Sequence, residues 1–132
     1  MLFLSFGSPK ALGAKAVDAG VPLFCQCQTM AHVREALDAG ACVIVAQGAE
    51  AGGHGGQRST LPFVPEVADL LAKRFPEVLL LAAGGIADGR GLAAGLMLGA
   101  DGVLVGSRFW AAEEALTPPA AAPRAITADG DQ

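Results

Sequence analysis

The chain has 132 residues, of which 52% are hydrophobic and 17% charged, a balance typical of one globular domain rather than a disordered segment. The net charge of −4 argues against nucleic acid or an anionic membrane surface as a partner, since both require clustered Lys and Arg. No apolar run approaches the roughly 20 residues that cross a bilayer. The apolar start, Met1 to Phe6, is interrupted by Pro9 before it reaches the length of a signal peptide.

The three cysteines, Cys25, Cys27 and Cys42, predict neither a disulfide framework nor a metal site. Their number is odd, and we expect Cys25 and Cys27 to point to opposite faces of one strand. All three are expected in the hydrophobic core. The sequence therefore predicts no bound metal and a reducing compartment, the cytoplasm.

Short apolar segments alternate with amphipathic ones at a period near twenty residues, which predicts repeated βα units. N-caps are expected at Ser8, Thr29 and Asp88. Between the third and fourth strands, a helix is predicted by apolar residues at i, i+3, i+4, i+7 and i+11: Val64, Val67, Ala68, Leu71 and Phe75. The predicted strands cover residues 2–6, 21–27, 42–46, 78–82 and 102–105.

The C-terminal residues differ in composition from the repeats. The segment Pro118 to Pro123 is rich in proline and alanine, and we expect it to break regular structure. The predicted organisation is one domain over residues 1–116 followed by a flexible tail over residues 117–132.

Five successive βα units predict an α/β fold with a parallel sheet, either an open doubly wound sheet or part of a barrel. Length alone favours the open sheet, because a complete (β/α)₈ barrel has about 250 residues. The barrel interpretation therefore expects about three further units. In both architectures ligands bind at the carboxyl ends of the strands, so the loops there distinguish the two.

Three of these loops carry candidate functional residues. Gln47 to Gly56 contains five glycines, which allow the backbone to approach a ligand, and one histidine, His54. An imidazole exchanges protons near neutral pH, so His54 is a candidate general base or acid. Ala83 to Gly89 and Gly106 to Arg108 each start a helix with free backbone N–H groups, a pattern that favours a phosphate.

The segments 24–29, 45–54, 82–89 and 99–110, in this order and spacing, resemble the nitronate monooxygenase family, formerly called 2-nitropropane dioxygenases. Each glycine-rich piece alone is weak evidence, but Gln47 to His54 followed by two phosphate-type loops is a specific combination. The resemblance implies an FMN-dependent (β/α)₈ barrel in which these units are strands 4 to 8. It also implies oxidation of alkyl nitronates or nitroalkanes by O₂ to a carbonyl compound and nitrite.

Carried over position by position, the resemblance makes His54 the catalytic residue and Gln47 and Gly52 flavin contacts. It assigns the FMN phosphate to Gly84, Gly85, Gly106 and Ser107. Family members often have Thr in place of Ser107, and the hydroxyl is retained. Glu50 is either a second acid or base or, as we expect, a partner in a loop salt bridge. Arg58 and Arg108 either neutralise phosphate or substrate charge or, as we expect, are solvated surface groups.

Two alternatives stay open. A related FMN barrel would act as an NADH:quinone or enoyl-acyl-carrier-protein reductase. A non-catalytic half-barrel would need a complementary chain or self-association to cover its strand edges. In family members, a strand at the start of the barrel lines the flavin ring. No equivalent strand precedes Leu2, and this favours the half-barrel alternative.

Overall fold

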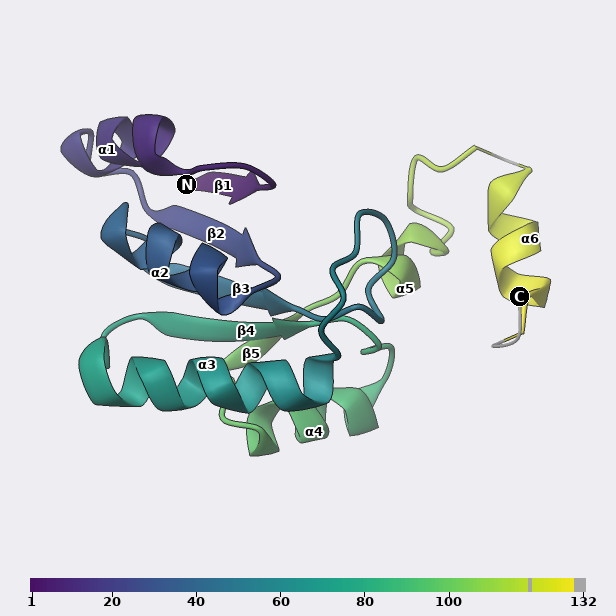
Figure 1. Ribbon diagram of the computed structural model, residues 1–132. Coiled ribbons are helices and arrows are strands. Elements are labelled where there is room, and N and C mark those ends of the chain that lie inside the picture. Colours follow the sequence, from purple (N-terminus) through teal and green to yellow (C-terminus); the bar gives the residue numbers. More distant parts are fainter. Residues whose placement is uncertain (119, 130–132) are drawn as a thin grey trace.

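The structure, a computed structural model, describes residues 1–118 and 120–129 and contains five strands that alternate with helices (Figure 1). The strands are β1 (Leu2–Ser5), β2 (Leu23–Cys27), β3 (Val43–Gln47), β4 (Leu79–Ala83) and β5 (Gly102–Leu104). The helices are α1 (Lys10–Asp18), α2 (Met30–Asp38), α3 (Thr60–Arg74), α4 (Gly89–Met97), α5 (Ser107–Trp110) and α6 (Ala121–Thr127). Within the described residues, no helix combines the length and the apolar character needed to span a membrane.

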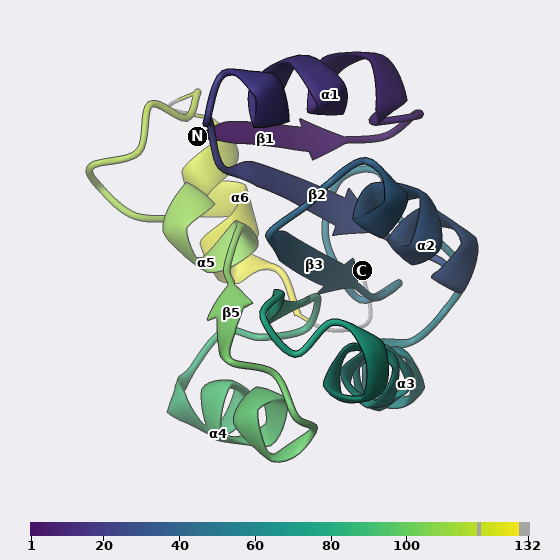
Figure 2. The same ribbon diagram turned by 90° about the vertical axis from the view of Figure 1, so that its left-hand side faces the viewer.

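The sheet is parallel throughout, and its strand order is the chain order, β1-β2-β3-β4-β5. Figure 2 shows α1 to α4 in an arc outside the strands. An open doubly wound sheet would carry helices on both faces and reverse its strand order. The arrangement is instead a sector of a (β/α)₈ barrel, and the predicted α/β fold with five βα units is confirmed.

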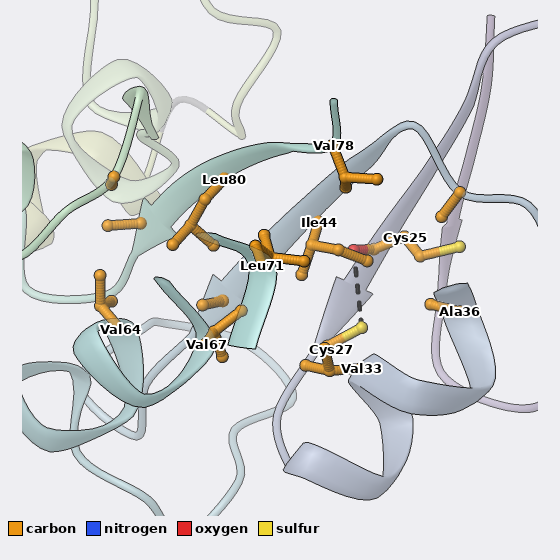
Figure 3. Packing of buried hydrophobic residues seen from close by; sticks show 14 of the residues in the cluster. Cys25, Cys27, Val33, Ala36, Ile44, Val64, Val67, Leu71, Val78 and Leu80 are labelled. Atoms are coloured by element: carbon orange, nitrogen blue, oxygen red, sulfur yellow. Dashed lines mark hydrogen bonds between the residues drawn. The ribbon is translucent and has the colours of Figure 1, made fainter. Parts of the chain in front are cut away.

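The hydrophobic core lies between the sheet and these helices (Figure 3). Alternate strand residues such as Leu23, Ile44 and Leu80 point toward the helices, because side chains on a strand alternate between its faces. They meet Val33 of α2 and Val67 of α3, which are fully buried. All residues of β3 are buried, as expected for the central strand of a parallel sheet.

The cysteines depart from the sequence prediction. Cys25 and Cys27 are two residues apart and therefore share one face of β2, where both are buried (Figure 3). The expectation of opposite faces was wrong, and so was a core position for Cys42, which is exposed. Burial raises the pKa of the Cys25 thiol to about 11 and that of Cys27 to about 12, with smaller contributions from Cys42 and Cys25 respectively. Both buried thiols therefore stay protonated.

Two of the three predicted N-caps are confirmed. The Thr29 side chain accepts a hydrogen bond from the backbone N–H of His32 at 3.2 Å, and that of Asp88 accepts one from Gly91 at 3.1 Å. The Ser8 prediction is confirmed only in part. Helix α1 begins at Lys10 after Pro9, and the Ser8 hydroxyl accepts the backbone N–H of Lys10 at the long distance of 3.5 Å. The same hydroxyl donates to the carboxylate of Glu35 in α2 at 2.6 Å.

The C-terminal segment contains a helix where the sequence predicted a break. Helix α6 begins at Ala121, and Pro123 lies in its first turn, where a missing N–H removes no intrahelical hydrogen bond. Figure 1 shows α6 beyond the carboxyl ends of the strands. Flexibility of residues 117–132 stays a prediction, and positions 119 and 130–132 lie outside the described residues.

Candidate active site

A cavity of about 400 Å³ opens at the carboxyl ends of β3, β4 and β5. Because parallel strands end at one edge of the sheet, the three candidate loops meet there despite their separation in sequence. The six residues predicted to bind the cofactor all line this cavity: Gln47, Gly52, Gly84, Gly85, Gly106 and Ser107. Small-molecule sites have volumes of roughly 300 to 1,000 Å³, and this cavity falls within that range.

Glycine is required where the cavity loops approach one another. Gly84 and Gly85 have φ values of 108° and 71°, in the left-handed region that L side chains rarely adopt. A Cβ atom on Gly84 would lie 2.8 Å from the Thr60 hydroxyl oxygen, and one on Gly52 would lie 2.9 Å from the Ser107 hydroxyl oxygen. The glycines therefore leave backbone, rather than side chains, at the cavity wall.

Glu50 connects two of the loops. Its carboxylate accepts the backbone N–H of Thr60 at 2.9 Å, at the start of α3, where the side chain of the N-cap residue Ser59 makes no capping hydrogen bond. The Thr60 hydroxyl lies 2.8 Å from the Glu50 carboxylate and 3.1 Å from the carbonyl oxygen of Gly84, and it donates to one of them at a time. Partial burial acts to raise the pKa of Glu50, but hydrogen bonds from Thr60, from its own backbone N–H and from Ser59 together outweigh it and lower the pKa. The predicted loop salt bridge was wrong.

Three glutamine side chains form a network beside the cavity. Gln47 is only 3% exposed, and its amide oxygen accepts hydrogen bonds from the amides of Gln26 and Gln28. Gln28 also donates to the backbone carbonyl of His54 at 2.7 Å, and Gln47 donates to the same oxygen at 3.3 Å. Sequence reasoning missed Gln26 and Gln28. The alternation of Gln26 with two buried cysteines was the available signal, because it places Gln26 on the opposite face of β2.

His54 lies in the same loop as Gln47 and Gly52, but its side chain does not line the cavity. Its imidazole is exposed, and the ring centroid lies 5.1 Å from that of Phe6 at the end of β1, with 50° between the planes. Among the described residues, neither imidazole nitrogen has a hydrogen-bond partner. Both nitrogens are therefore available for a hydrogen bond to a ligand.

The two arginines of these loops differ. Arg58 pairs with Glu66 and lies 4.8 Å from the ring centroid of Phe63, so its guanidinium is only partly solvated. Arg108 is exposed and lines the cavity next to Ser107. It is therefore the arginine that can supply positive charge to a bound anion.

Comparisons with known proteins bear on the family and on the barrel fold. The family model described as nitronate monooxygenase matches residues 2–132. A nitronate monooxygenase of Neurospora crassa is 49% identical over 106 residues, which are 76% of this chain and 28% of that protein. FabK from Thermotoga maritima superposes with a TM-score of 0.88 at 31% identity and covers 96% of this chain and 39% of its own. A nitroalkane oxidase from Streptomyces ansochromogenes superposes with a TM-score of 0.77 at 27% identity. The match covers 92% of this chain and 38% of the oxidase.

Proposed function

Because the chain belongs to the nitronate monooxygenase family, we propose that its five βα units form the cofactor-binding part of an FMN-dependent enzyme. The proposed reaction is the oxidation of alkyl nitronates or nitroalkanes by O₂ to a carbonyl compound and nitrite. The chain spans 28% of the curated relative's length, so the activity is proposed for the barrel of which these units are a part. The cavity that all six candidate cofactor residues line is the observation that carries the proposal.

The residues present fit FMN. Gly84 and Gly85 present backbone free of side chains, and the Ser107 hydroxyl and the Arg108 guanidinium line the same cavity. Backbone N–H groups, a hydroxyl and a guanidinium are the donors that bind phosphate in proteins. We assign the FMN phosphate to Gly84, Gly85, Gly106 and Ser107, with Arg108 contributing positive charge. Gln47 and Gly52 are assigned to the flavin ring.

His54 is assigned the role of general base. A neutral nitroalkane loses the proton on its α-carbon: the C–H bond breaks, the electron pair stays with the substrate as the nitronate, and the proton moves to the imidazole. The free nitrogens of His54 support this role. FMN would supply the electron-accepting chemistry of the oxidation when bound. A preformed nitronate carries no such proton and does not need the base.

The test compares two substrates in His54→Asn. We expect turnover of a neutral nitroalkane to fall by about 10² to 10⁴, the usual contribution of a positioned base, while turnover of the preformed nitronate changes little. His32→Asn is the control, because His32 is the other histidine of the chain, is exposed on α2 and accepts only a long hydrogen bond of 3.5 Å from the backbone N–H of Gln28. Equal losses on both substrates would overturn the base assignment. Oxidation of NADH with a quinone, without turnover of nitronates, would replace the proposed reaction by that of a reductase.

A second candidate function is a half-barrel that binds a complementary chain or a second copy. The sheet face opposite α1 to α4 supports it: Leu79 is 51% exposed and Leu104 36%, and Phe3 and Phe24 are half-buried there. Three apolar side chains of α4 are also exposed: Leu92, Leu96 and Met97. Light scattering of the purified chain distinguishes the cases. A monomer that binds FMN supports the first proposal, and a colourless oligomer supports the second.

A further inference from the structure

Phe6 has a conformation that stability alone does not favour. Its φ of 63° lies in the left-handed region, which is costly for a bulky side chain because Cβ approaches the following carbonyl oxygen. The side chain is 56% exposed, so burial returns little of that cost. Strained backbone that persists in this way is concentrated at functional sites.

The ring of Phe6 contacts the candidate base. Its centroid lies 5.1 Å from that of the His54 imidazole, within the range of favourable aromatic pairs, and the tilt of 50° is neither stacked nor perpendicular. The contact joins the end of β1 to the loop after β3. No hydrogen bond holds the imidazole among the described residues, so the contact with the Phe6 ring leaves both imidazole nitrogens free.

The backbone of His54 is held separately. Gln28, which follows β2, donates one amide hydrogen to the His54 carbonyl at 2.7 Å and the other to the amide oxygen of Gln47 at 3.2 Å. Gln47 is buried and lines the cavity. The backbone carbonyl of His54 is thereby hydrogen-bonded to Gln28 after β2 and to Gln47 of β3. The His54 side chain contacts Phe6, which directly follows β1.

We propose that Phe6 and Gln28 are positioning residues for His54. Gln28 fixes the backbone from which the imidazole projects, and Phe6 fixes the direction in which the imidazole faces. The strained backbone of Phe6 is the conformation that turns its ring from the strand toward the loop. The inference rests on the proposed role of His54 as base and adds the residues that aim it.

Nuclear magnetic resonance tests the positioning without flavin or substrate. The chain has two histidines, so each imidazole C–H signal can be assigned with His32→Gln. In the wild type, we expect the Phe6 ring current to shift the His54 signal. We expect Phe6→Gly to abolish this shift without lowering the thermal midpoint, because glycine adopts φ near +60° without strain. Two control variants accompany this test. Phe6→Tyr keeps an aromatic ring at this position and should retain the shift. Phe109→Leu, at another exposed phenylalanine, should leave the His54 signal unchanged.

Gln28→Met tests the backbone half of the proposal, because it keeps the length of the side chain and removes the donor. We expect it to broaden the His54 signal through exchange among several loop conformations. An unaltered His54 signal in Phe6→Gly or in Gln28→Met overturns the part assigned to that residue. Circular dichroism of each variant confirms that the signals come from folded protein.

Kinetics in the flavin-loaded enzyme provide the second readout. For a neutral nitroalkane we expect kcat to fall about 10- to 100-fold in Phe6→Gly, with KM little changed, because misdirection of the base affects the proton transfer. Turnover of the preformed nitronate should stay at the wild-type rate, and Phe6→Tyr should restore kcat. A wild-type kcat in Phe6→Gly overturns the proposal. If His54→Asn has no effect on either substrate, the proposed function fails instead, and the NMR signals then decide only whether Phe6 contacts the imidazole and whether Gln28 holds the His54 backbone.

Discussion

The Glu50 carboxylate caps the N-terminus of α3 by accepting hydrogen bonds from both the backbone N–H and the hydroxyl of Thr60, at 2.9 and 2.8 Å. A helix leaves its first N–H groups without intrahelical partners, and a nearby residue usually supplies the acceptor. Here the acceptor comes from the loop that also carries His54. Glu50 therefore contributes both to the stability of α3 and to the position of that loop.

Glu50→Ala should lower the free energy of unfolding by about 1 kcal/mol, the usual cost of removing a helix cap. Chemical denaturation measures the loss. Glu77→Ala is the control, because Glu77 is exposed in the turn before β4 and caps no helix. Equal stability of the two variants would show that the Glu50 contact is not maintained in solution.

Glu50 should also make the stability depend on pH. Its pKa in the folded protein lies below the ordinary value of 4.5, so its contribution is present above pH 4.5 and is lost as the pH falls through the folded pKa. Hydrogen bonds to Arg90 lower the pKa of Asp88 and act in the same direction. The difference between wild type and Glu50→Gln isolates Glu50. We expect this difference, measured by thermal unfolding, to shrink on acidification, and a constant difference would contradict the assignment.

Gly84→Ala should disrupt the cavity. The added Cβ would lie 2.8 Å from the Thr60 hydroxyl oxygen at a φ of 108°, so both the contact and the backbone are strained. We expect a lower thermal midpoint and loss of FMN binding, measured by quenching of flavin fluorescence. Gly89→Ala is the matched control, because nothing lies within 4 Å of its Cβ position at the start of α4. Alanine there should be neutral or slightly stabilising. Equal effects of the two substitutions would contradict the structure of the loop.

The cysteines should differ in reactivity. Cys42 is exposed, whereas Cys25 and Cys27 are buried with pKa values raised from 9.0 to about 11 and about 12. At pH 8 we expect a thiol reagent to label Cys42 in the folded protein and all three cysteines after unfolding, as counted by mass spectrometry. Rapid labelling of Cys27 in the folded protein would show that β2 is not packed against α2.

The same raised pKa values predict alkaline destabilisation. The folded state retains the two thiol protons to higher pH than the unfolded state does, so their contribution is complete below pH 9.0 and is lost as the pH rises toward about 12. Above pH 9 the thermal midpoint of the wild type should therefore fall more than that of the double variant Cys25→Ala, Cys27→Ala, which has no buried thiols. Parallel decreases would contradict the assigned burial.

Local physical chemistry made much of the fold predictable. The apolar period and the caps at Thr29 and Asp88 act within a few residues, so the order of strands and helices could be deduced from the sequence. The glycines at Gly84 and Gly85 likewise marked a loop of unusual backbone, and the structure places them at the cavity. Two predictions were wrong for local reasons. Residues two apart on a strand share a face, so Cys25 and Cys27 lie on the same side of β2. Proline is tolerated in the first turn of a helix, so Pro123 lies within α6.

The sequence by itself determined the five βα units, the glycine-rich loops and the family to which the chain belongs. Only the tertiary structure decided which distant groups meet. Glu50 contacts Thr60, Gln28 binds the backbone carbonyl of His54, and the Phe6 ring contacts the His54 imidazole. The reason is physical. Each of these contacts joins segments that become neighbours only when parallel strands pair side by side and end at one edge of the sheet. No local pattern of residues records that proximity.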